Sequence, residues 1–191
     1  MGKKLEENLK AGYKFPGNSI QIGVSTNSLG YGVNNFVSKD SPIPFFWGGA
    51  AEVKSGIALH YHRNIFHARK VFSFDWGAAF SYWQSRRDKN RFCTVSLFPL
   101  LRFTLARLQS ADIYFNYSVA GPTFISRVVV DGYDTGKHFT FQDFMGMGIY
   151  TGKKRNLNAE IRIAHYSNGN LFPENEGLMI PLTFNIGWSF E

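Results

Sequence analysis

The sequence contains very little cysteine and no long apolar run. Cys93 is the single cysteine among 191 residues, so an intrachain disulfide and a metal site built from several thiolates are both excluded. Apolar residues never continue for the ~18 positions that a membrane-spanning helix needs. A transmembrane β-barrel remains compatible with the sequence, because its strands alternate between apolar and polar residues and produce no such run.

The amino-terminal stretch MGKKLEENLKAGYKF also lacks the apolar core of a secretory signal. The chain is therefore expected to be either a mature form with an added Met or a cytosolic protein. The formal net charge of +7 favours anionic partners, such as phosphates, nucleic acid or an anionic lipid surface, although solubility alone accounts for many basic chains. The length of 191 residues predicts a single domain over 1–191.

Aromatic residues and glycine, in contrast, are abundant. Aromatic residues form 17% of the chain and there are 19 glycines, yet the mean hydropathy is only −0.20. Apolar content that is diluted by interleaved polar residues favours alternating β-strands over buried helices.

The segment VFSFDWGAAFSYW, residues 71–83, shows the clearest alternation. Its even-numbered positions from Phe72 to Tyr82 hold mostly large aromatic residues, and its odd-numbered positions from Ser73 to Ser81 hold small residues and Asp75. A narrow closed barrel has no room for the bulky face inside, so this face is expected to point outward. Seven further segments alternate in the same way: 18–27, 49–63, 92–105, 112–120, 138–150, 156–170 and 180–190.

These eight segments predict an all-β fold, an eight-stranded antiparallel transmembrane β-barrel of the bacterial outer membrane. The expected turns at one end are short, and they comprise 64–70, 106–111 and 151–155. The expected loops at the other end are mostly longer, and they comprise 28–48, 84–91, 121–137 and 168–177. Short periplasmic turns and long external loops are typical of such barrels, which makes 1–17 a periplasmic N-terminal segment.

Two details of the strand assignment follow from the same parity. Asp143 interrupts the apolar face of its segment, which predicts a β-bulge there. Ile180 and Phe184 of the last segment are both expected on the outward face. The alternative fold is a soluble barrel of lipocalin type with its aromatic residues inside, but it would leave Asp75, Arg102, Glu160 and Arg162 outside around a lumen filled with Phe and Trp.

The stretch EIRIAHYSNGN, residues 160–170, contains the candidate site. His165 and Ser167 fall on the same parity as the apolar Ile161 and Ile163, so they are expected on the membrane-facing side near the external end of the strand. A substrate reaching this place would be a lipid of the outer leaflet.

Histidine and serine in this arrangement suit ester hydrolysis. Histidine is the usual base that activates a serine hydroxyl near neutral pH, and Cα atoms two residues apart in a strand are about 6.5 to 7 Å apart. The side chain of Asn168 and the N–H groups of Gly169 and Asn170 are candidate donors to an oxyanion. His-x-Ser also recurs by chance in strands, and histidine is common at membrane interfaces.

The motif AHYSNGNLFPENEG resembles the signature of the outer-membrane lipid A deacylase family (PagL), in which His-x-Ser-Asn is followed by Asn-x-Gly. The matching residues here are His165, Ser167, Asn168, Asn175 and Gly177. The resemblance implies an eight-stranded barrel that hydrolyses the ester-linked acyl chain at position 3 of lipid A. It further implies that His165 is the general base, Ser167 the nucleophile and Asn168 part of the oxyanion hole, with Gly169 and Asn175 in support, and it implies no cofactor.

One position departs from the family. Its well-known members carry a glutamate two residues after the Asn-x-Gly glycine that orients the histidine, whereas this chain has Met179. Three carboxylates are candidate replacements, Glu174, Glu176 and Asp143, and we choose Glu176 because its loop is expected to fold back beside the His-Ser pair. A Ser-His dyad without an acid is expected to work at a reduced rate.

The remaining motifs carry less. His60 and His62 share a face and lack an apparent third metal ligand, so a polar lumen accounts for them better than a metal site. The basic cluster RRDKNR is expected to cap an external turn or to meet lipid A phosphates, and GKKRN to cap a periplasmic turn.

Three functions follow from these expectations. The first is an outer-membrane serine esterase acting on lipid A, with lipopolysaccharide and the membrane as partners and no nucleic acid. The second is a non-enzymatic barrel, structural or adhesive, which Met179 favours. The third is a soluble ligand-binding barrel. The sequence leaves open whether the barrel forms a homodimer.

Overall fold

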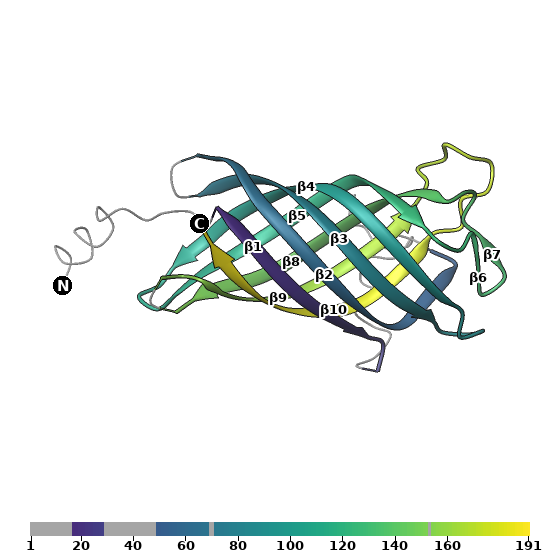
Figure 1. The fold of residues 1–191 in the computed structure, drawn as a ribbon, viewed down its shortest axis with the longest axis horizontal. Coiled ribbons are helices and arrows are strands. Elements are labelled where there is room, and N and C mark those ends of the chain that lie inside the picture. Colours follow the sequence, from purple (N-terminus) through teal and green to yellow (C-terminus); the bar gives the residue numbers. More distant parts are fainter. Residues whose placement is uncertain (1–16, 29–48, 69–70, 153) are drawn as a thin grey trace.

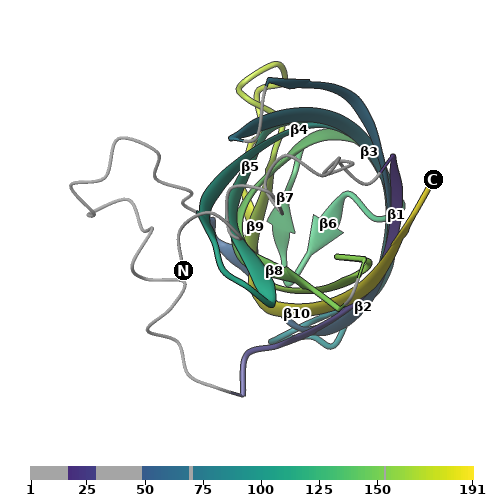
Figure 2. The same ribbon diagram turned by 90° about the vertical axis from the view of Figure 1, so that its left-hand side faces the viewer.

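The computed structural model describes residues 17–28, 49–68, 71–152 and 154–191. Eight of its strands form one antiparallel sheet that closes on itself, because β1 pairs with both β2 and β10 (Figures 1 and 2). The barrel strands are β1 (Asn18–Thr26), β2 (Ala51–Ala68), β3 (Phe72–Ser85), β4 (Arg91–Arg107), β5 (Ala111–Ile125), β8 (Phe139–Thr151), β9 (Leu157–Ser167) and β10 (Leu178–Phe190). The predicted eight-stranded antiparallel barrel is confirmed.

The outer surface of the barrel is apolar, as the alternation predicts. Ile22 on β1, Phe80 on β3 and Ile186 on β10 are 55%, 53% and 72% exposed. The residues between them on the same strands, such as Gln21, Asp75 and Asn185, are buried. An apolar band of this extent around the whole molecule requires a hydrocarbon environment rather than water. No helix within the described ranges is long and apolar enough to cross a membrane.

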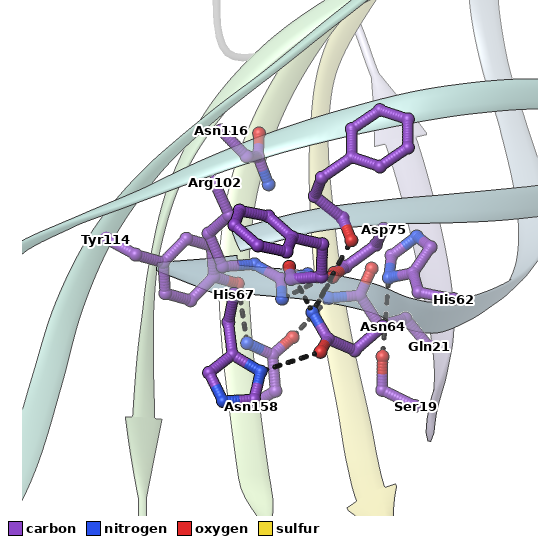
Figure 3. Close-up of polar contacts among 12 residues, drawn as sticks. Ser19, Gln21, His62, Asn64, His67, Asp75, Arg102, Tyr114, Asn116 and Asn158 are labelled. Carbon is purple, nitrogen blue, oxygen red and sulfur yellow. Dashed lines mark hydrogen bonds and ion pairs between the residues drawn. The ribbon is translucent and has the colours of Figure 1, made fainter. Parts of the chain in front are cut away.

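The lumen between the periplasmic end and the middle of the barrel is filled by paired polar side chains. Arg102 Nη1 lies 2.7 Å from Asp75 Oδ2, and Asn64 Nδ2 donates to the other carboxylate oxygen at 2.6 Å (Figure 3). His62, which the sequence placed in a polar lumen, contacts Ser19 through its Nδ1 atom at 3.3 Å. Buried charges are tolerated here because each has a partner of opposite sign or a hydrogen bond.

The external half of the lumen is partly apolar, which the strand alternation did not predict. A cluster of buried residues there includes the aromatic side chains of Trp83, Phe92, Phe98, Phe144 and Tyr166. These residues occupy the parity that is polar elsewhere, so a rule that places all bulk outside misses them. The expectation for Ile180 was wrong for a related reason. It is 1% exposed within this cluster, because the β9–β10 register shifts between Ile180 and Thr183 and reverses the alternation.

A small hairpin lies at the external end of the barrel. Strands β6 (Val129–Val130) and β7 (Tyr133–Asp134) pair with each other in the connection between β5 and β8. Val130 is fully buried in the apolar cluster of the lumen, and the view along the barrel places the hairpin over the mouth (Figure 2). The hairpin therefore lies over the external mouth with Val130 anchored in the lumen.

The strand ends differ from the expected ones in two places. β2 continues to Ala68 and β5 to Ile125, so the expected turn 64–70 and the beginning of the expected loop 121–137 are strand. A β-strand can extend beyond its alternating part wherever the neighbouring strand offers hydrogen bonds, as β3 does for β2 up to Ala68 and Phe72. Residues 1–16 and 29–48, which hold most of the expected N-terminal segment and first external loop, lie outside the described residues.

Candidate functional site

The candidate site lies at the external end of β9. His165 and Ser167 occupy alternate positions of this strand, and Ser167 is its last residue. Alternate positions of a strand share a face. Ile161, on the same parity, is 47% exposed to the membrane side, and Arg162 on the other parity is buried in the lumen. By this parity, His165 and Ser167 belong to the outward-facing side of β9.

The two neighbouring strands place one residue each directly opposite His165. Asp143 of β8 is its partner on one side, and Met179 of β10 is its partner on the other. Phe141 of β8 stands opposite Ser167. His165 is only 6% exposed, so its imidazole is buried by neighbouring side chains and does not lie on an open surface.

Asp143 is held in place by a bulge in the next strand. Its Oδ1 atom accepts a hydrogen bond of 2.6 Å from the N–H of Ala120 on β5. Ala120 has a φ of 52° and lies where the β5–β8 register shifts, between Ser118 and Gly121. β8 itself pairs with β9 without a shift from Phe141 to Thr151. The expected bulge therefore exists, but it lies in β5 and not at Asp143.

Asn168, directly after β9, fastens the loop that follows. Its side chain is fully buried, and its Nδ2 atom donates to the carbonyl oxygens of Thr135 and Glu174. Its backbone N–H donates to Asn175 Oδ1 at 2.8 Å. These contacts tie the loop 168–177 to the segment after β7, and they engage both hydrogens of the Asn168 amide.

The two glutamates of this loop are exposed, and the structure records hydrogen bonds of their backbone atoms. Glu176 is exposed, and its N–H donates to the carbonyl oxygen of Asp134 at 3.1 Å. Glu174 is also exposed, and its carbonyl accepts the bond from Asn168. Neither residue belongs to a strand that pairs with β9 at His165. The sequence favoured Glu176 from the expected course of its loop, but only strand register shows which carboxylate stands opposite the histidine, and that residue is Asp143.

An apolar groove of about 710 Å³ opens on the membrane face beside the site. Pro122 and Phe139 are part of its lining. Pro122 stands opposite Phe141, which stands opposite Ser167, and two strand spacings make that separation about 10 Å. The remaining lining residues are Val95, Leu97, Thr123, Phe124, Val128, Gly136, Lys137 and His138.

Three of the four cations in the cluster RRDKNR are engaged by the protein itself. Arg86 Nη1 lies 2.7 Å from Glu52 Oε2, and Arg87 donates to the carbonyl oxygen of Asp131. Lys89 Nζ donates to the carbonyl oxygen of Arg86 at 2.7 Å. The first of the two expected roles, capping an external turn, therefore accounts for these three side chains.

The profile of the family described as lipid A 3-O-deacylase (PagL) matches residues 53–188. This chain belongs to that family. The match covers β2 to β10 with the intervening loops, including the residues of the candidate site. No curated protein matches the sequence.

Two solved structures share the fold. The crystal structure of the outer membrane enzyme PagL aligns with a TM-score of 0.59 and 16% identity, over 91% of this chain and 99% of that one. The crystal structure of Neisserial surface protein A (NspA) aligns with a TM-score of 0.52 and 10% identity, over 91% of this chain and 97% of that one. With the family match, these likenesses identify the lipid A deacylase homologue described here as an integral outer-membrane barrel.

Proposed function

We propose that this protein is a serine esterase that removes the 3-O-linked acyl chain of lipid A in the outer leaflet. The observation that supports the proposal most is that His165 and Ser167 occupy alternate positions at the external end of β9, on the parity of the exposed Ile161. In this proposal an ester of an outer-leaflet lipid reaches the pair without leaving the membrane. Family membership supports the same substrate class.

In the proposed reaction Ser167 Oγ attacks the carbonyl carbon of the ester while His165 accepts its proton. The backbone N–H groups of Gly169 and Asn170 are the proposed oxyanion donors. Both residues have positive φ, 64° and 63°, in the turn that directly follows Ser167. His165 then returns the proton to the leaving 3-hydroxyl of the sugar, and water attacks the acyl-enzyme with His165 again as base, which releases a free fatty acid.

The proposed roles of Asn168 and Asn175 are in support. Asn175 Oδ1 binds the Asn168 N–H at 2.8 Å, and Asn175 Nδ2 donates to Asn170 Oδ1 at 2.8 Å. Together these bonds fix the turn that carries the oxyanion donors, and a turn that is fixed before the reaction stabilises a developing charge better than a mobile one. The apolar groove lined by Pro122 and Phe139 is the proposed binding place for an acyl chain.

Lipid A from cells that express the protein tests the proposal. We expect lipid A to lose one ester-linked 3-hydroxyacyl chain when the unsubstituted protein is expressed, and to keep all of its acyl chains when the Ser167→Ala variant is expressed. Ser110→Ala, an exposed serine in the turn between β4 and β5, is the matched control and is expected to retain activity. Unchanged lipid A from correctly folded, unsubstituted protein would contradict the esterase.

The second candidate is a barrel without enzymatic activity. Met179 supports it, because this residue stands opposite His165 on β10 and methionine cannot orient an imidazole by accepting a strong hydrogen bond. In that case the Ser167→Ala strain and the unsubstituted strain would have identical lipid A.

A further inference from the structure

His165 has a neighbour on each side that decides whether its imidazole can be oriented. On the β10 side the residue opposite it is Met179, and on the β8 side it is Asp143. All three residues lie on the outward parity of adjacent strands, Asp143 and Met179 half-buried and His165 buried. Directly opposite residues of an antiparallel pair have Cβ atoms about 4.5 to 5.5 Å apart. That separation suits a hydrogen bond between a carboxylate and an imidazole.

We propose that Asp143 is the positioning residue of the active site, and that its carboxylate on β8 holds His165 for proton transfer with Ser167. The proposal rests on the esterase function proposed above. It assigns the orienting acid to the strand on the opposite side of β9 from Met179. Asp143 accepts a hydrogen bond from one imidazole N–H, so the other ring nitrogen is free of a proton and acts as the base.

The contact with Ala120 makes Asp143 suited to this role. One carboxylate oxygen is fixed by the Ala120 N–H at 2.6 Å, and an ionised carboxylate has further acceptor capacity on its second oxygen. A backbone donor in a β-bulge holds the carboxylate at a defined position, which a long exposed side chain would not achieve without a loss of rotamer entropy. An imidazole that contacts such a carboxylate is restricted in its turn.

No other carboxylate on the strands around His165 faces the same way. Within β8, β9 and β10, all of which the structure describes, the carboxylates are Asp143 and Glu160. Glu160 is 4% exposed and lies in the lumen, where it accepts hydrogen bonds from Arg162 and Tyr114. Glu176 is the competing candidate from the loop, and its exposed side chain has to fold back over the end of β9 to reach the imidazole.

Steady-state kinetics with purified protein in detergent and lipid A as the probe test the assignment. The Asp143→Asn variant keeps an oxygen for the Ala120 N–H, so we expect it to fold and to show the usual difference in gel mobility before and after boiling. We expect kcat to fall by about 10²- to 10⁴-fold and KM to change little, because the proposed role of Asp143 is to act through His165 and not on the substrate. The Glu176→Gln variant is the matched control, with kcat close to that of the unsubstituted protein.

Rescue from the other side of β9 distinguishes positioning from a structural role. Met179 stands opposite His165 as Asp143 does, so adding Met179→Glu to the Asp143→Asn variant returns a carboxylate to the imidazole. We expect kcat to rise by about tenfold or more over the single variant. A merely structural defect at Asp143 would not respond to a second substitution on β10.

A second readout does not depend on turnover. Nitrogen-15 NMR of the imidazoles, with His165 assigned by its loss in a His165→Asn variant, reports which ring nitrogen holds the proton. We expect one tautomer in the unsubstituted protein and a mixture in the Asp143→Asn variant. Absence of turnover in the unsubstituted protein would overturn the esterase and leave this measurement intact. Unchanged kcat and tautomer in Asp143→Asn, or a loss of kcat in Glu176→Gln instead, would overturn the role of Asp143.

Discussion

On the lumen side of β9, Glu160 and Arg162 lie 2.7 Å apart within a network of buried hydrogen bonds. On the membrane side of the same strand, His165 and Ser167 have apolar neighbours and a single carboxylate opposite the histidine. In the lumen the Glu160 carboxylate contacts a cation and further hydrogen-bond donors. Its acceptor capacity is used for the stability of the barrel. On the membrane face few polar partners are present, so each contact sets the chemistry of one side chain.

The buried polar network on the lumen side of β9 is tested by removing one charge. Glu160 accepts hydrogen bonds from Arg162, Tyr114 and Asn116 at 2.7 to 2.8 Å, so Glu160→Ala leaves the guanidinium of Arg162 buried without its ion-pair partner. We expect a loss of about 3 to 5 kcal/mol in the free energy of unfolding, measured by urea titration in lipid bilayers. Removing the cation as well, with Arg162→Met, is expected to restore part of the loss. Equal stability of the unsubstituted and Glu160→Ala proteins would contradict the network.

The membrane-facing side of β9 is tested by adding a charge at Ile161, which lies between Glu160 and Arg162 in the sequence. Ile161 is 47% exposed on that face, and Ile161→Lys places an ammonium near the middle of the hydrocarbon layer. We expect a loss of about 2 to 4 kcal/mol in the same measurement. Leu157, at the periplasmic beginning of β9 and 43% exposed, is the control, since Leu157→Lys is expected to cost about 0 to 1 kcal/mol at the interface. Equal costs at both positions would show that β9 does not cross the layer as assigned.

The packing of the loops on the site is tested at Gly136. This residue has a φ of 99°, and a Cβ atom there would lie 2.6 Å from both Asn168 Nδ2 and the carbonyl oxygen of Glu174. We expect Gly136→Ala to cost about 1 to 3 kcal/mol and to lower the rate of lipid A deacylation by displacing Asn168. Gly152→Ala is the control, because Gly152 also has a positive φ, 88°, but lies in a periplasmic turn. Its deacylation rate is expected to be normal, and a normal rate in Gly136→Ala as well would separate the loop contact from the site.

The smallest effect is expected in the external loops and depends on pH. Burial alone would raise the pKa of the Asp131 carboxyl, but hydrogen bonds from the Ser85 hydroxyl and from the N–H groups of Arg87 and Asp88 outweigh it, so this pKa lies below its ordinary value. A lowered pKa in the folded state means that the ionised form stabilises the fold. The contribution is complete above the ordinary carboxyl pKa of about 3.9 and is lost as the pH falls through the lower folded value.

We therefore expect Asp131→Asn to lower stability by about 1 kcal/mol at neutral pH, with the difference shrinking below about pH 4 and vanishing once the pH falls below the lowered pKa of the folded state. Thermal unfolding in detergent across this pH range measures it. Asp88→Asn is the control, because Asp88 forms an exposed ion pair with Arg87 at 3.2 Å, and such pairs contribute about 0 to 1 kcal/mol. A difference between unsubstituted and Asp131→Asn proteins that persists at low pH would contradict the ionised carboxylate as its cause.

Much of the barrel could be predicted because strand alternation depends on local sequence. Residues 72–82 alternate in exposure as the sequence indicates, and Asp75 lies in the lumen as expected. The apolar layer around Phe98 and Phe144 could not be predicted in this way. Its members are apolar residues at inward positions, so both faces of the strand are apolar there and the alternation gives no sign of which face is inside. Whether the lumen is polar or apolar at a given height depends on the other strands.

The candidate site was predictable in part for the same reason. The shared face of His165 and Ser167 follows from their spacing within one strand. The carboxylate did not follow. The sequence favoured Glu176 over Glu174 and Asp143 from the expected course of its loop, whereas strand pairing places Asp143 opposite His165. The sequence placed the bulge in the wrong strand. The extra residue is in β5, at Ala120, and its N–H donates to Asp143 on β8. The polar residue that interrupts an apolar face is therefore on the strand beside the bulge.

The sequence by itself determined that this protein is a membrane barrel and which side of β9 faces the lipid, because side chains of a strand alternate with a period of two whatever their neighbours are. Only the tertiary structure decided which residues stand beside His165. Register between strands depends on the lengths of the connections and on bulges such as the one at Ala120, and a shift of one residue would replace Asp143 by a side chain of the opposite face.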